Sequence, residues 1–465
     1  MIRCSFGRKG SPWEFNLRDV FRWLELMQKD HVTDPAEYLD IIYMQRMRTH
    51  EDRVHIVQLY ESVFNVKYDR PVKPHYQVTA TSFNVGHSRL PRKQTGSSLD
   101  VFEHQDHVLQ SFLSPLESLI KCVESSWMAI VTGPSASGKT SLVRLLSKMT
   151  GNRLEEFAMN NSVDTMELLG GFEQVDLNRH RQVVMDSLHQ MVNQASKSLL
   201  MYFTTLASDS EQYGTILQLV RQLNDAWYAL ESKQHMQHMS ADPEAGALDY
   251  TLVSNVIHCL NSASVVDQEA QTSIEAVSVS IQNLQKLEKE TVAGKFEWID
   301  GLLINALEKG YWLLIDNANM CNPSVLDRLN PLFENDGVLM VNERGLVDGT
   351  VKVIKPHPNF RMFMTVDPQN GELSRAMRNR GIEISLVDSN WNKNPQDVIK
   401  LANALGVRGP KLPMLLNTLQ GEATAQRRQF VKGENVRDYL LFATYLVERL
   451  QRGQSLKAAI RDCPA

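Results

Sequence analysis

The apolar positions at the start of the chain recur with helical spacing and then give way to a strand-like pattern. Side chains from Trp13 to Leu24 follow the three-to-four-residue repeat of an amphipathic helix, and a second helical stretch covers about 36–64. Residues 67–96 instead hold three prolines and a run of β-forming residues from Val78 to Val85. The pattern predicts a helical region followed by a linker that contains some strand and is lightly basic.

The rest of the chain alternates apolar strands with helices, apart from one long helical stretch. Between 104 and 177 the expected order is helix, strand, glycine-containing loop, helix and strand. Helical periodicity then dominates 182–292 and returns over 391–465. The expected strands are 127–131, about 154–159, 311–315 and 360–365. This alternation predicts an α/β fold, a parallel sheet flanked by helices, with a helical insertion of three or more helices.

Charge and cysteine content narrow the classes of protein. A net charge of −5 and a pI near 6.2 argue against a chain whose main task is to hold nucleic-acid backbone, and no sequence-specific nucleic-acid binding is expected. No apolar run is long enough to span a membrane, so no membrane partner is expected. The five cysteines are scattered without metal-binding or redox spacing, which is typical of reduced thiols in an intracellular protein.

The loop after the first strand carries the strongest chemical signal. Its sequence has two glycines that let backbone N–H groups turn inward around phosphate oxygens, and the helix that follows adds the positive end of its dipole. Lys139 is expected to reach the β- and γ-phosphates of ATP, and the Thr140 hydroxyl to bind Mg²⁺. The predicted nucleotide-binding residues are Gly133, Pro134, Ser135, Ala136, Ser137, Gly138, Lys139, Thr140 and Ser141.

Two later strands end in polar residues that fit the same site. Asp316 closes an apolar strand and is the expected second Mg²⁺ ligand, followed by Asn317. The strand at 360–365 leads to Asp367, which could face the γ-phosphate or the attacking water. Taken alone, each is also what a buried strand followed by an ordinary turn looks like. The phosphate-binding loop at 133–140 (the P-loop) favours a role in the nucleotide site for both Asp316 and Asp367.

Arginines are clustered near a helix that follows the last of these strands. In a ring-forming ATPase such a cluster supplies an arginine finger to a neighbour's γ-phosphate, and Arg380 is the first candidate and Arg378 the second. A solvated helix face is the ordinary alternative. Asn16-Leu17-Arg18-Asp19 is repeated as Asn435-Val436-Arg437-Asp438, each opening an amphipathic helix, and this repeat indicates parts of two tandem modules. Arg437 is the candidate arginine that senses nucleotide from the C-terminal helical domain.

Together these residues resemble the AAA+ ATPases, and among them the dynein-related ATPases of large ribosomal subunit assembly. The matching segments are 133–140, 156–159, 164–174, 315–319, 322–330, 342–345 and 373–380. The resemblance implies ATP and Mg²⁺ as cofactors and several AAA+ modules of one polypeptide closed into a ring. It further implies pre-60S ribosomal particles and their assembly factors as partners, and a nuclear location in nucleolus and nucleoplasm.

With this resemblance the chain divides into parts of two modules. Arg18 becomes the lid arginine of a preceding module, and the chain is expected to be a fragment or a short isoform. The expected parts are 1–66, helical lid of the preceding module; 67–103, linker; 104–181, first part of the large domain; 182–292, helical insertion; 293–390, second part of the large domain; and 391–465, an incomplete helical lid.

The sequence departs from the AAA+ pattern at two positions. Asp316 takes the place of the Walker B Asp, which binds Mg²⁺ in these ATPases. The residue after that Asp is usually the Glu that activates water, and here it is Asn317. Asp367 stands at a second position where Asn is usual. Loss of a general base lowers turnover by roughly 10²–10⁴-fold. We favour a site that binds ATP and hydrolyses it poorly. The alternative is an exchange in which Asp367 supplies the carboxylate and Asn317 the amide.

Three functions compete at this stage. The first is a motor module whose ATP cycle remodels pre-ribosomes, and the second is a structural module that binds nucleotide while others hydrolyse it. The third, a P-loop kinase of small molecules, has no use for lid arginines or for a repeated lid. We favour a packed helical scaffold for the insertion, and a docking surface for other parts of the ring or for a pre-ribosome is the alternative.

Overall fold

The computed structural model describes most of the chain and gives it two compact units. The described residues are 6–69, 74–93, 108–205, 212–238, 248–263, 268–289, 296–334, 337–347, 349–386, 395–404, 436–455 and 458. One unit comprises 1–171 and 300–465, and the other 172–299. Most of the expected C-terminal lid, and residues 94–103 of the expected linker, lie outside the described residues.

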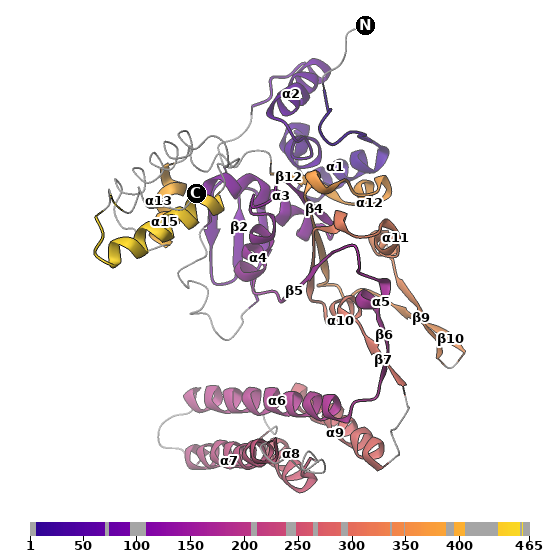
Figure 1. The fold of residues 1–465 in the computed structure, drawn as a ribbon, viewed down its shortest axis with the longest axis vertical. Coiled ribbons are helices and arrows are strands. Elements are labelled where there is room, and N and C mark those ends of the chain that lie inside the picture. Colours follow the sequence, from indigo (N-terminus) through magenta and orange to yellow (C-terminus); the bar gives the residue numbers. More distant parts are fainter. Residues whose placement is uncertain are drawn as a thin grey trace. The chain divides into compact units, whose positions relative to one another are not determined.

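A five-stranded parallel sheet forms the centre of the first unit (Figure 1). Its strand order is β12-β4-β11-β8-β5, and each neighbouring pair is parallel. The strands are β4 (Ala129–Thr132), β5 (Leu154–Ala158), β8 (Trp312–Asp316), β11 (Arg361–Val366) and β12 (Ile382–Ser385). The central strands are continuous apolar runs, as expected where helices cover both faces of a parallel sheet. The predicted α/β fold with a parallel sheet is therefore confirmed.

Short helices and a strand pair complete this domain. The helices are α3 (Leu113–Glu124), α4 (Lys139–Thr150), α5 (Thr165–Leu169), α10 (Leu302–Lys309), α11 (Pro323–Asp327) and α12 (Arg375–Arg380). The short turns are η4 (Gln110–Phe112), η6 (Ala318–Met320), η7 (Asn330–Phe333) and η8 (Pro368–Asn370). β9 (Leu339–Val347) and β10 (Thr350–Ile354) pair antiparallel. Leu116, Leu119, Val143 and Leu314 are fully buried in the main core.

The N-terminal helical region packs on this domain. It contains α1 (Leu17–Lys29), η1 (Pro35–Tyr38), η2 (Asp40–Met44) and α2 (His50–Phe64). Leu26, Tyr38, Ile41 and Ile42 are buried in the same core as α3. Polar side chains cap α1, η1 and α2 at Asn16, Asp34 and Thr49, and Asn16 and Asp19 form a capping box at α1.

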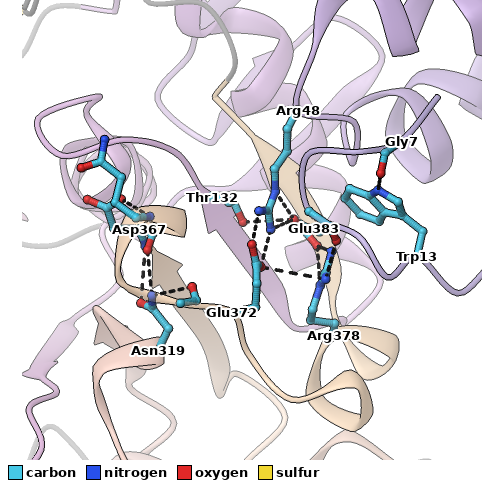
Figure 2. A network of polar contacts seen from close by, with 12 residues as sticks. Gly7, Trp13, Arg48, Thr132, Asn319, Asp367, Glu372, Arg378 and Glu383 are labelled. Carbon is cyan, nitrogen blue, oxygen red and sulfur yellow. Dashed lines mark hydrogen bonds and ion pairs between the residues drawn. The ribbon is translucent and has the colours of Figure 1, made fainter. Parts of the chain in front are cut away.

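Arg48 ties this helical region to the large domain through a buried ion pair with β12 and a partly exposed one with the loop before α12 (Figure 2). Arg48 Nη2 lies 2.8 Å from Glu383 Oε1 and 2.7 Å from Glu372 Oε2. The Ser385 N–H donates to the carbonyl of Gln45 at 2.7 Å, which extends the contact through the backbone. The lid and β12 are thus held by charge-assisted hydrogen bonds in addition to apolar contacts.

The segment expected to be a linker differs from the expectation. β1 (Tyr76–Val78), β2 (Ser82–Val85) and β3 (Ser88–Pro91) form a three-stranded antiparallel sheet. Phe83, Val85 and Leu90 are buried in the main core. Strand propensity was visible in the sequence, but burial depends on long-range packing against α3 and α4. Residues 74–93 therefore belong to the compact unit instead of connecting two units.

The second unit is a bundle of long helices (Figure 1). It contains α6 (Leu177–Thr205), α7 (Gln212–His238), α8 (Tyr250–Ala263) and α9 (Gln268–Lys289), with β6 (Gly170–Gln174) and β7 (Phe296–Asp300) paired at its chain ends. Leu188, Leu223 and Val256 are fully buried in a core of its own. The expected insertion at 182–292 lies inside this unit.

Two described helices follow the large domain. α13 (Pro395–Ala404) and α15 (Val436–Gln451) pack against each other. Asp397 in α13 accepts hydrogen bonds from the N–H groups of Gln110 at 2.7 Å and Ser111 at 3.1 Å. In the described part of the chain, no helix is long and apolar enough to cross a membrane.

Candidate nucleotide-binding site

The predicted P-loop connects β4 to α4 and needs glycine at its end. Gly138 has φ +88°, a left-handed conformation that side chains rarely adopt. A Cβ there would also lie 2.7 Å from the Phe112 ring. Both constraints make glycine the residue that lets the loop turn into α4 at Lys139.

Lys139 is buried at the mouth of this loop. Its Nζ donates to the carbonyl oxygens of Gly133 at 2.9 Å and Pro134 at 2.8 Å. Burial lowers the pKa of Lys139 below its ordinary value, and the negative charges of Asp367 and Asp316 act in the opposite direction. The ammonium group therefore lies in the field of both strand-end carboxylates.

The loop carries polar groups that the protein does not satisfy internally. Ser137 Oγ is buried and has no hydrogen-bond partner among the described residues. A buried polar atom without a partner is unusual in a folded protein. Pro134, Ser135 and Ser141 are exposed along the same segment. Together with Lys139, this loop fits a polyphosphate.

The predicted metal ligands meet across the sheet. Asp316, at the end of β8, accepts a hydrogen bond at Oδ1 from Thr140 Oγ1 at 2.9 Å. Thr365, at the end of β11, also donates to Asp316 Oδ1. A hydroxyl and a carboxylate are the hard oxygen ligands that Mg²⁺ prefers. Thr140 and Asp316 therefore fit the cation that accompanies ATP.

Thr365 is a site residue that the sequence reasoning did not single out. Its hydroxyl links Asp316 to the next residue, because Thr365 Oγ1 also accepts the Asn317 N–H at 2.9 Å. The signal was present as the single polar residue in the buried run 362–366. Thr365 thereby fixes the strand end on which Asp316 and Asn317 stand.

Asn317 occupies the position after the Walker B Asp in a left-handed conformation. Its φ is 54° and its ψ 46°, a region that Asn tolerates better than most residues. Its side chain is half-buried and makes no hydrogen bond with other described residues. The backbone therefore suits Asn here, and whether this residue assists hydrolysis stays a prediction.

Asp367 is positioned by Asn319, a second residue that sequence reasoning did not assign. The Asn319 amide donates to the carbonyls of Asp367 at 2.7 Å and Gly371 at 2.9 Å, and its oxygen accepts the Asp367 N–H at 3.4 Å (Figure 2). The Asp367 carboxylate accepts the Gln369 N–H at 3.0 Å and is only 5% exposed. This turn holds a buried carboxylate beside the P-loop lysine.

Arg378 does not have the surroundings of an arginine finger. Its guanidinium pairs with Glu383 at 3.0 Å, donates to the Gly10 carbonyl at 2.8 Å and lies 4.6 Å from the Trp13 ring centre (Figure 2). A side chain with these contacts and 5% exposure is committed to the lid contact. The second-choice finger is thus corrected to a structural anchor.

Arg380 is more accessible. Its Nε donates to Glu334 Oε1 at 3.0 Å, and Arg18 approaches the other oxygen of the same carboxylate at 3.4 Å. No hydrogen bond or ion pair of the described residues joins Arg380 to the P-loop. This suits action on another module's nucleotide, which stays a prediction. Arg437 lies in α15, but its side chain is outside the described residues.

A parallel sheet in this strand order, with a P-loop and a strand-end Asp facing its threonine, defines an AAA+ P-loop ATPase domain. Comparison with known proteins agrees. A family model described as the midasin AAA lid domain matches residues 2–67, and a model of the AAA domain of the dynein-related subfamily matches 259–380.

Curated relatives match almost the entire chain. Midasin of Dictyostelium discoideum is 41% identical over 99% of this chain and 8% of its own length. Midasin of Giardia intestinalis is 28% identical over 85% of this chain and 9% of its own. The chain belongs to the midasin family. It spans less than a tenth of the length of these relatives.

Proposed function

We propose that this chain is an ATP-binding AAA+ module of a midasin-like ring ATPase that remodels pre-60S ribosomal particles and releases assembly factors. The observation that carries the proposal is the hydrogen bond between Thr140 and Asp316, which brings both expected Mg²⁺ ligands together at the P-loop. The 41% identity to a midasin supports the larger assignment.

Each residue of the site has a distinct task in this function. ATP with Mg²⁺ supplies the transferable phosphoryl group. Lys139 binds phosphate oxygens as a point charge, and the P-loop N–H groups orient the same oxygens. Thr140 and Asp316 hold the cation, while Thr365 and Asn319 keep the two strand ends in place.

The hydrolysis step separates the motor function from a structural one. Asn317 cannot accept a proton from water, which favours a module that binds ATP and turns over slowly. Asp367 is buried near Lys139 and is the carboxylate left to act as a base. Because Asn317 removes the usual base, a structural module that binds ATP but hydrolyses little of it is the second candidate function.

The proposed partners follow from the family. They are the other AAA+ modules of the ring and pre-60S particles with their assembly factors, in the nucleolus and nucleoplasm. Neither a membrane nor a specific nucleic-acid sequence has a role in this function.

The test uses the complete natural polypeptide with Lys139→Ala as its only change. Purified pre-60S particles are incubated with it and ATP, and released assembly factors are quantified against wild type. We expect release to fall at least about tenfold. Wild-type release with no ATP bound at this module would contradict the proposal.

A further inference from the structure

Two arginines that are candidates for reading nucleotide, Arg18 and Arg380, share a single carboxylate. Arg380 Nε lies 3.0 Å from Glu334 Oε1, and Arg18 Nη2 lies 3.4 Å from Glu334 Oε2. Arg18 belongs to α1, Arg380 ends α12, and Glu334 directly follows η7. Three segments that are distant in the sequence thus place two guanidinium groups on the two oxygens of one side chain.

A buried contact, and not the shared carboxylate, sets the distance between the two arginines. Arg22 follows Arg18 by one turn of α1 and is buried. Its guanidinium donates to the backbone carbonyls of Arg380 and Gly381. α1 and α12 are therefore joined beneath the surface, and their guanidinium groups are held close together. Two like charges at short distance repel each other, so an anion beside them stabilises this arrangement.

Glu334 neutralises only half of this positive charge. Among the ion pairs of the described residues, its carboxylate is the one partner of both Arg18 and Arg380. One net positive charge therefore remains on the cluster. The side chains are also accessible, with exposed fractions of 40% for Arg18, 46% for Glu334 and 25% for Arg380. A more highly charged anion can thus reach the arginines and take the place of the carboxylate.

The expected tasks of the two arginines indicate which anion this is. Arg18 lies in the segment that matches a midasin AAA lid domain, where it is the expected lid arginine of the preceding module. Arg380 is the candidate finger, which acts across a junction between modules. Because the two side chains lie together, both tasks point to the same ligand, the γ-phosphate of ATP bound by the preceding module. A terminal phosphate carries more than one negative charge and accepts paired hydrogen bonds from arginine.

We infer that Glu334 is an intramolecular competitor for this γ-phosphate. Its carboxylate holds Arg18 and Arg380 while the preceding module is without ATP, and both arginines exchange it for the phosphate when ATP binds there. The inference rests on the proposed function of the chain as a ring module, and it adds a regulatory residue that lies outside the P-loop site. Ion pairs between partly exposed side chains contribute little free energy, so the exchange is readily reversible. Glu334 should therefore weaken ATP binding at the preceding module and leave ADP binding unchanged, because ADP has no γ-phosphate.

Glu334→Gln in the natural full-length polypeptide tests this inference. The substitution keeps the size of the side chain and removes its charge. The polypeptide is irradiated with a subsaturating concentration of 8-azido-ATP and digested, and the labelled peptides are identified by mass spectrometry. We expect labelling of the preceding module to rise about threefold, which is the effect of removing one exposed ion pair. Labelling with 8-azido-ADP should stay at the wild-type level.

Two further variants separate competition from a general effect of charge. Glu308→Gln is the matched control, because Glu308 is 44% exposed and pairs with Lys352 at 2.9 Å. It should leave the labelling of the preceding module unchanged. When Arg380→Ala is already present, Glu334→Gln should give a smaller gain, because Arg18 alone is left to be released.

Several results would overturn the inference. A fall in 8-azido-ATP labelling at the preceding module would mean that Glu334 positions the arginines for the nucleotide instead of competing with it. Equal labelling of wild type and Glu334→Gln, no labelling of the preceding module, or an equal gain with 8-azido-ADP also contradicts it. The peptide that carries Lys139 is measured in the same digest. Failure of this module to bind ATP is thereby distinguished from failure of the competition.

Discussion

Thr140 and Asp316, which are 176 residues apart in the sequence, are joined by a 2.9 Å hydrogen bond at the edge of the parallel sheet. A helical unit with its own core separates them along the chain. The contact is possible because β4 and β8 both flank β11 and end at the same edge. The polar ends of parallel strands meet in this way at ligand sites of α/β folds.

The helical unit should be dispensable for nucleotide binding. Leu169 O and Gly301 N are joined by a 2.9 Å hydrogen bond, so the two ends of the excursion already lie together. Replacing 175–295 with a short Gly/Ser loop should leave ATP affinity within a few-fold, since loop closure depends weakly on length. Equilibrium binding of a fluorescent ATP analogue measures it. Unfolding of the shortened chain would show that the insertion belongs to the core.

Substitution of Arg378 should destabilise the fold much more than substitution of Arg380. Arg378→Met removes a buried partner of Glu383 and should lower the free energy of unfolding by roughly 3 kcal/mol. Arg380→Ala breaks a half-exposed pair with Glu334 and should change it by less than about 1 kcal/mol. Urea unfolding compares both with wild type. Equal losses would contradict the distinction between anchor and finger.

In the assembled ring, Arg380→Ala should reduce ATP turnover at the adjacent module, because an arginine finger is worth roughly 10³-fold or more in rate. ATP binding at Lys139 should be unchanged. The measurement is single-site turnover in the ring, paired with nucleotide binding at this module. Collapse of binding at this site alone would show that Arg380 serves its own module.

Asn317 and Asp367 distinguish a slow site from an exchanged one. In a slow site, Asn317→Glu restores a base and should raise turnover at least about tenfold, although the left-handed backbone at 317 makes Glu less favourable by roughly 1 kcal/mol. Asp367→Asn should then also help. In an exchanged site, Asp367→Asn abolishes turnover instead. A fall in turnover on Asn317→Glu would refute the slow-site interpretation.

Binding of ATP should take up protons at alkaline pH. Burial lowers the pKa of free Lys139, and phosphate charges raise it again on binding, so binding is coupled to proton uptake. Affinity should fall as pH rises through the free-state pKa. Calorimetry in two buffers of different ionisation enthalpy measures the uptake, with Lys139→Arg as the control that stays protonated. Proton release on binding would contradict the sign.

Local sequence patterns predicted the positions of the strands and helices. The burial and the role of individual side chains depend on tertiary contacts. The P-loop and the strands bearing Asp316 and Thr365 follow from apolar runs and glycines within short windows. Arg378 lies in an arginine cluster typical of an arginine finger. Its contacts with Glu383 and Trp13, which the sequence does not reveal, identify it as a structural anchor instead. Likewise, strand propensity at 76–91 gave no sign that Phe83 is buried against distant helices. Long-range burial cannot be read from periodicity alone.

ATP binding by this chain with and without Lys139→Ala tests the central claim most directly. Lys148→Ala, an exposed lysine on the same helix, is the matched control. Removing the positive charge of Lys139 from the P-loop should weaken binding of a fluorescent ATP analogue at least about a hundredfold, equivalent to roughly 2.8 kcal/mol. Lys148→Ala should bind as wild type does. Unchanged affinity in folded Lys139→Ala would contradict the assignment of an ATP site.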